Sequence, residues 1–96
     1  MSEVVNAAVE KLSEKIDSFD SSAKFVITGE GAIMIDEGGV RPAEDGEEAE
    51  VTLTASRETF EGIMDGSVNP TTAFMTGKLA LDGSMAVAMQ LGQKLS

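Results

Sequence analysis

Residues 23–40, AKFVITGEGAIMIDEGGV, contain two successive hairpin signals. Apolar residues alternate with their neighbours in 25–28 and again in 32–36, which is the period of a strand with one buried face. Gly29-Glu30-Gly31 separates the two runs and Gly38-Gly39 follows the second. Glycine pairs at such positions are typical of tight hairpin turns. The stretch therefore predicts the antiparallel part of a β-sheet.

The sequence on either side predicts a helix before this stretch and more of the sheet after it. Apolar residues recur at helical spacing at Val5, Val9, Leu12, Ile16 and Phe19, the stripe of an amphipathic helix. Residues 40–43 predict a weak strand, and because Pro42 cannot donate to a ladder, this strand belongs at a sheet edge or outside the sheet. Residues 51–54 alternate again and predict a clear strand.

The second half of the chain predicts three helices and one further strand. Ser56 can cap a helix that Gly66 ends, and Asn69-Pro70 places a capping residue and a proline where a second helix would start. Residues 79–82 alternate as in a strand, and a last helix is expected over roughly residues 84–95.

This order of elements predicts an α+β fold in a single domain, residues 1–96. One mostly antiparallel sheet would have helices packed over a face. If the strands that contain Val51 and Leu79 are parallel, the helical connection between them should be right-handed.

The composition excludes several classes of function. The chain has neither Cys nor His, which removes thiolate nucleophiles, imidazole bases and the usual zinc ligands. No paired acids stand at a recognisable spacing. We therefore expect a protein that is not an enzyme and that holds no metal and no cofactor.

The charge is strongly acidic, with 17 Asp and Glu against 7 Lys and Arg. No basic footprint for nucleic acid is visible. The acidic surface fits two interpretations, a self-repelling soluble protein or adaptation to a high-salt cytoplasm. No apolar run is long enough to span a bilayer and no signal peptide is apparent, so a cytoplasmic location is expected.

The last predicted helix carries more apolar surface than one sheet can cover. Its apolar residues are Met85, Val87, Ala88, Met89, Leu91 and Leu95. The second apolar face must meet another helix, a partner subunit or an apolar ligand. Methionine is abundant here, and its flexible side chain adapts to irregular shapes.

Two motifs in this half resemble those of a known family. Residues 69–79, NPTTAFMTGKL, and residues 82–91, DGSMAVAMQL, are similar to the C-terminal half of the sterol carrier protein type 2 family. Residues 49–56, AEVTLTAS, resemble the strand before that half. The resemblance implies a five-stranded mixed, mostly antiparallel sheet, with helices packed over one face. It also implies a hydrophobic tunnel between sheet and helices for fatty acids, acyl-CoA, phospholipids or sterols.

The resemblance also implies which residues form the tunnel wall. On the helices these are Phe60, Ile63, Met64, Phe74, Met75, Met85, Ala88 and Met89. Strand alternation adds Leu53, Leu79 and Leu81 on the sheet.

The hypothesis is therefore an intracellular lipid carrier that binds fatty acids or related apolar ligands. The alternative is a non-catalytic module that dimerises or presents acyl substrates to a separate enzyme. The expected partners are a lipid or acyl-chain ligand and, in the alternative, a second copy in a homodimer. Transient membrane contact is disfavoured by the acidic charge.

Overall fold

The computed structural model describes residues 3–44 and 46–95 of the chain. The elements are α1 (Glu3–Lys15), β1 (Ala23–Ile27), β2 (Gly31–Asp36), β3 (Gly39–Pro42), β4 (Val51–Ala55), α2 (Arg57–Asp65), α3 (Pro70–Met75), β5 (Leu79–Gly83) and α4 (Met85–Leu95). The predicted α+β class and the predicted order of elements are confirmed. The side chain of Leu95, which the sequence placed on the apolar surface of the last helix, lies outside the described residues.

The sheet has the strand order β3-β2-β1-β4-β5. Strands β1 and β4 are parallel, and the other three neighbouring pairs are antiparallel. Pro42 lies on edge strand β3, opposite Ile33, as its missing N–H requires. Strand β5 is antiparallel to β4, with Ala55 opposite Leu79. The right-handed crossover expected for parallel strands is therefore absent here. The segment with α2 and α3 reverses the chain direction, so that β5 runs antiparallel to β4.

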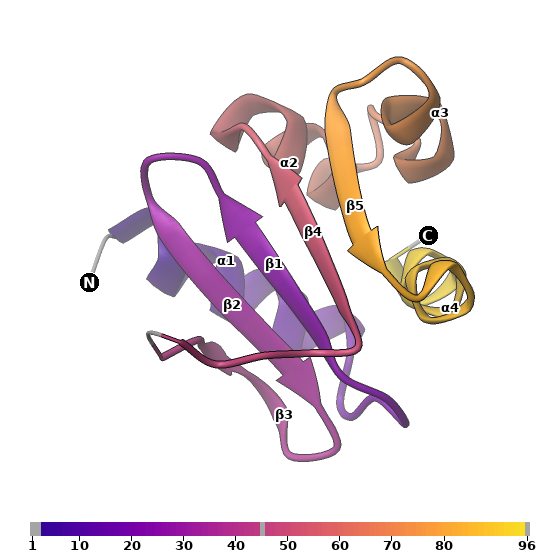
Figure 1. Ribbon diagram of the computed structural model, residues 1–96. Coiled ribbons are helices and arrows are strands. Elements are labelled where there is room, and N and C mark those ends of the chain that lie inside the picture. The colour runs from indigo at the N-terminus through magenta and orange to yellow at the C-terminus, as the bar shows by residue number, and fades with distance from the viewer. Residues whose placement is uncertain (1–2, 45, 96) are drawn as a thin grey trace.

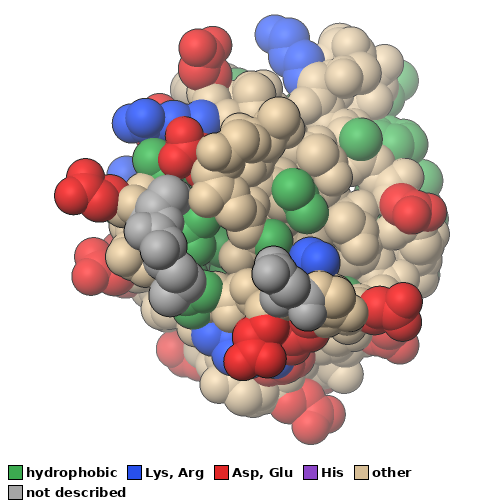
Figure 2. Space-filling view, turned by 60° about the vertical axis from the view of Figure 1, so that its left-hand side comes forward, with side chains coloured by type: hydrophobic (Ala, Val, Ile, Leu, Met, Phe, Trp, Pro, Cys, Tyr) green, Lys and Arg blue, Asp and Glu red, His purple; other side chains and the backbone are tan. Residues whose placement is uncertain are grey.

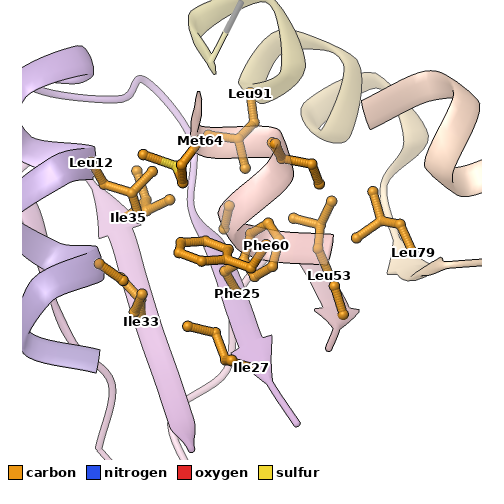
Figure 3. Close-up of a cluster of buried hydrophobic side chains, with 14 of the residues drawn as sticks. Leu12, Phe25, Ile27, Ile33, Ile35, Leu53, Phe60, Met64, Leu79 and Leu91 are labelled. Atoms are coloured by element: carbon orange, nitrogen blue, oxygen red, sulfur yellow. The ribbon is translucent and has the colours of Figure 1, made fainter. Parts of the chain in front are cut away.

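The helices cover one face of the sheet, with α1 and α2 behind the central strands and α3 and α4 near β5 (Figure 1). Alternate strand residues face them and are buried. These residues include Ala23, Phe25, Ile27, Ile33, Ile35, Val51, Leu53 and Ala55. Labelled core side chains from α1, α2, α4 and the strands point toward one another in Figure 3. Phe25 and Phe60 meet edge to face, with ring centroids 4.7 Å apart.

The opposite face of the sheet is crossed by the loop that joins β3 to β4 (Figure 1). Lys24 Nζ donates a hydrogen bond to the carbonyl of Glu47 in this loop, at 3.1 Å. Arg41 on β3 forms ion pairs with Glu47 and with Asp36. The hydrogen bond from Arg41 and a second one from the backbone N–H of Glu44 lower the pKa of Glu47 to about 2.

This loop anchor gives a pH-dependent stability. Because the folded pKa of Glu47 lies below its ordinary value of 4.5, its contribution is complete above that value and is lost as pH falls toward 2. Replacing Glu47 with Gln is expected to make the fall in melting temperature between pH 4.5 and pH 2 shallower. Circular dichroism melts across this pH range measure the effect, and E48Q controls for the loss of one nearby carboxylate. An unchanged acid slope in E47Q would contradict the anchor.

Candidate functional site

Helix α3 is fixed beside β5 by local signals that the sequence contains. The side chain of Asn69 accepts hydrogen bonds from the backbone N–H groups of Thr71 and Thr72, at 2.8 and 3.2 Å. Pro70 occupies the first turn, where its fixed φ suits a helix and its missing N–H costs nothing. Gly77 then adopts a positive φ of 81°, which turns the chain directly into β5.

Helix α4 begins immediately after β5. The Ser84 hydroxyl accepts a hydrogen bond from the backbone N–H of Val87 at 3.3 Å. Ser84 therefore caps the N-terminus of α4, as serine commonly does. The backbone N–H of Ser84 donates to the carbonyl of Glu50 at 2.9 Å. Helix α4 is thereby tied to the start of β4, and α3 and α4 flank β5.

A cavity of about 300 Å³ lies among α3, β5 and α4. Its lining residues are Phe25, Leu53, Ile63, Pro70, Thr71, Phe74, Met75, Leu79, Leu81, Met85, Ala88, Met89, Leu91 and Gly92. Among these described residues none carries a charge, and Thr71 alone has a polar side chain. We call this space the α3–α4 cavity. Phe25, Leu53, Leu79 and Leu91 point into the interior between sheet and helices in Figure 3.

The cavity has a closed floor and an open mouth. Phe25, Ile63 and Leu91 at the floor are all buried. The mouth is formed by four large apolar side chains that remain exposed: Phe74 (39%), Met75 (79%), Met85 (46%) and Met89 (63%). The cavity therefore opens to the surface at one end and reaches the hydrophobic core at the other.

The structure brings most of the sequence-predicted tunnel residues together here. Those that line the cavity are Leu53, Ile63, Phe74, Met75, Leu79, Leu81, Met85, Ala88 and Met89. Phe60 and Met64 do not line it. Both are buried core residues and border a separate shallow hollow between α1 and α2, because α2 turns these two side chains toward α1 and the centre of the sheet.

Sequence reasoning missed five lining residues: Phe25, Pro70, Thr71, Leu91 and Gly92. A signal existed for two of them. Phe25 alternates with Val26 in the first predicted strand, which places it on one face, and the structure sets it opposite Leu53 across β1 and β4. Leu91 is three positions after Ala88, which places both on one face of a helix.

The extra apolar face of the last helix is accounted for by this cavity. Val87, Ala88 and Leu91 are buried, whereas Met85 and Met89 lie exposed at the mouth. The helix thus packs one face on the protein and presents the other to an open space.

The titratable side chains of the described residues lie apart from this cavity. No group of three or more Asp or Glu side chains there could hold a metal ion. The pKa shifts occur at Arg41, Glu47 and Asp65, none of which lines the cavity. None of the helices described has the length and apolar character needed to cross a bilayer.

The sheet, the helix-covered face and the uncharged cavity define a small α+β domain with an internal apolar pocket. Comparison with known families identifies it further: the chain belongs to the SCP-2 sterol transfer family, whose sequence model matches residues 3–96. The resemblance found in the two C-terminal motifs is confirmed.

Known relatives show the same affiliation. The chain is 39% identical over 64 residues to peroxisomal multifunctional enzyme A of Dictyostelium discoideum, covering 67% of this chain and 13% of the relative. It is 32% identical over 84 residues to hydroxysteroid dehydrogenase-like protein 2 of Xenopus laevis, covering 81% and 20%. The chain thus spans a fifth or less of the length of these two relatives.

A solved structure confirms the fold. Sterol carrier protein 2 of Aedes aegypti, determined in complex with the C16 fatty acid palmitate, superimposes with a TM-score of 0.78 at 19% identity. The match covers 100% of this chain and 97% of the other. The five-stranded mixed sheet with its helices is therefore the fold of this family.

Proposed function

We propose that the protein binds one acyl chain, such as that of a fatty acid, in the α3–α4 cavity and carries it between sites. The observation that carries this proposal is the uncharged lining that connects a buried floor to an exposed apolar mouth. The volume of about 300 Å³ is at the lower end of the range for small-molecule sites, about 300–1,000 Å³. This size favours a single chain over a bulkier lipid.

The lining also sets the orientation of the ligand. An ionised carboxylate would lose its hydration inside the cavity and find no charged partner there, which is unfavourable. The head group is therefore expected to stay at the mouth, with the chain directed toward Phe25 and Leu91. Head groups of different charge would then be tolerated.

The expected affinity is moderate, as a carrier needs. If about twelve methylenes of a sixteen-carbon chain are buried, the gain is roughly 10 kcal/mol. An association cost of at least about 4 kcal/mol leaves a dissociation constant on the order of 10–100 µM. Such a complex releases its ligand readily.

Native mass spectrometry and ligand displacement test the proposal. Freshly purified protein is expected to show mass peaks for co-purified acyl lipids, and palmitate should displace a fluorescent fatty acid with an inhibition constant in that micromolar range. Octanoate serves as the matched short-chain control and should compete far more weakly, because it buries fewer methylenes. Equal competition by both acids, or none by palmitate, would contradict binding in an extended apolar cavity.

The length of the relatives supports a second candidate, an accessory module that presents an acyl substrate to a separate catalyst. In the two relatives the matched region is 13% and 20% of a longer protein. Both candidates assign the chain itself a binding role. The cavity lining supports this role because it contains no charged side chain that could act as an acid or a base. The two candidates are distinguished by adding the chain to a separate acyl-processing enzyme and measuring the KM of that enzyme for its acyl substrate. If the chain presents the substrate, the KM falls. If the chain is a free carrier that withholds the substrate, the KM rises. The cytoplasmic location stays a prediction.

A further inference from the structure

The mouth of the cavity gathers the large apolar side chains that the described part of the chain leaves exposed. Phe74 and Met75 come from α3, and Met85 and Met89 come from α4. We call these four residues the apolar rim. Exposed apolar side chains scattered singly are ordinary on proteins, but a group around one opening marks a contact surface.

The charge is distributed unevenly along the chain, and the rim lies in its nearly neutral part. Of the 17 acidic residues, Asp82 is the only one after Asp65, and the same segment contains Lys78 and Lys94. Residues 66–96 therefore carry a formal charge of +1, and residues 1–65 carry a formal charge of −11. The two sum to the net charge of −10. On β5, Asp82 alternates with the cavity-lining Leu81 and so points to the other side of the sheet. Figure 2 shows a face of the molecule with acidic side chains spread around its margin.

We propose that the apolar rim docks the mouth of the cavity onto a lipid bilayer with electrically neutral, zwitterionic head groups. The rim is apolar and its segment is close to neutral, which matches the interface of such a bilayer. The rim also surrounds the opening, so an acyl chain passes between bilayer and cavity without crossing water. This inference goes beyond binding and carriage, because it assigns the surface and the orientation of membrane contact.

A second copy of the chain fits the rim less well. If each of the four side chains has about 200 Å² of surface, as an aromatic residue does, the exposed part amounts to roughly 450 Å². A stable protein interface buries about 800 Å² per partner. Association would also bring together two molecules with a net charge of −10 each, whereas a zwitterionic surface adds no repulsion.

The charge distribution predicts an unusual salt dependence on anionic membranes. The molecule measures 29 × 27 × 25 Å, so at about 0.01 M salt, where the Debye length is about 30 Å, every acidic group senses the membrane. At about 0.15 M the Debye length is about 8 Å, and only charges near the rim remain effective. Binding to anionic vesicles should therefore increase with salt, opposite to the behaviour of proteins that dock through basic patches.

Vesicle flotation with delipidated protein tests this surface. The protein is expected to float with phosphatidylcholine vesicles, and the double variant M75S/M89S should float roughly tenfold less, since two apolar side chains no longer enter the interface. Its melting temperature should stay unchanged, because both side chains are mostly exposed. Flotation with vesicles containing phosphatidylglycerol should rise between 0.01 and 0.15 M NaCl.

A matched pair of charge insertions tests the orientation. A86E adds a carboxylate on the exposed side of α4 next to Met85, and S13E adds one on the exposed side of α1. A86E should reduce flotation several-fold, whereas S13E should leave it within twofold. An equal loss in both variants, or a loss in S13E alone, would overturn docking through the rim.

Sedimentation equilibrium tests whether a second copy of the chain covers the rim. A monomer at tens of micromolar is expected for the unmodified chain. If it is instead a dimer that M75S/M89S converts to a monomer, the rim is a subunit interface and the docking proposal is wrong. Because flotation is measured without ligand, a failure of docking is distinguishable from a failure of palmitate binding.

Discussion

Replacing Gly92 with Leu is expected to weaken palmitate binding about fiftyfold while it stabilises the protein. Gly92 lies within α4 and lines the α3–α4 cavity. A Cβ atom built at this position meets no heavy atom within 4 Å, so a larger side chain has room to extend into the cavity. A leucine would displace about three methylenes of the ligand, worth roughly 2.4 kcal/mol.

The stability should change in the opposite direction. Glycine inside a helix costs roughly 0.5–1 kcal/mol relative to alanine, and the leucine side chain would in addition cover the apolar floor. G92A is the matched control, because it removes the helix penalty but leaves most of the cavity open. Displacement assays and thermal melts on both variants measure the two effects. If G92L binds palmitate as tightly as G92A does, the ligand lies outside the α3–α4 cavity.

The fold is largely predictable from local signals in the sequence. Alternation and glycine turns indicate the strands, and Ser56, Asn69 and Ser84 mark three helix starts because each accepts a hydrogen bond from a backbone N–H in the first helical turn. The end of the first helix is predicted too late: α1 ends at Lys15, before Ile16 and Phe19 of the predicted stripe. The sequence leaves the direction of β5 relative to β4 open, since it depends on how α2 and α3 pack, and no local pattern encodes that packing.

The candidate site is predictable to a lesser extent. The family resemblance and the apolar surplus of the last helix both indicate Met85 and Met89. The family resemblance implies Phe60 and Met64 for the same wall as Ile63, but of these three residues only Ile63 lines the cavity. The sequence shows these apolar residues, but the rotation of α2 about its axis decides which of them face the cavity.

The uneven distribution of charge changes how the acidic composition is interpreted. Taken over the whole chain, the net charge of −10 argues against membrane contact. Taken by position in the sequence, it leaves residues 66–96, which contain the whole apolar rim, with a formal charge of +1. Asp20 of the acidic part borders α4 in a hollow with Gln90, Gln93 and Lys94, none of which belongs to the rim. The same distribution fits both interpretations of the acidic surface, a soluble self-repelling protein and adaptation to high salt. In both cases the charge is needed only on faces that stay in water.

Two phenylalanines, Phe60 in the core and Phe74 at the mouth, provide the sharpest separation between stability and binding. Phe60 is 2% exposed and packs edge to face on Phe25. Truncation of a buried phenylalanine costs about 3–5 kcal/mol, a large part of the roughly 5–15 kcal/mol that holds a domain folded. F60A should therefore lower the melting temperature by more than about 12 °C.

F74A makes the same chemical change on the cavity mouth and should give the reverse pattern. Phe74 is 39% exposed and lines the cavity, so its loss should cost the fold less than about 1 kcal/mol and weaken palmitate binding about tenfold. Chemical denaturation and displacement assays at 10 °C, where folded F60A can still be titrated, compare the two variants. Because Phe60 does not line the cavity, folded F60A should bind palmitate within a few-fold of the unmodified protein. A stable F60A that has lost palmitate binding would mean that the ligand reaches Phe60, and that the binding site extends under α2 as the family resemblance implies.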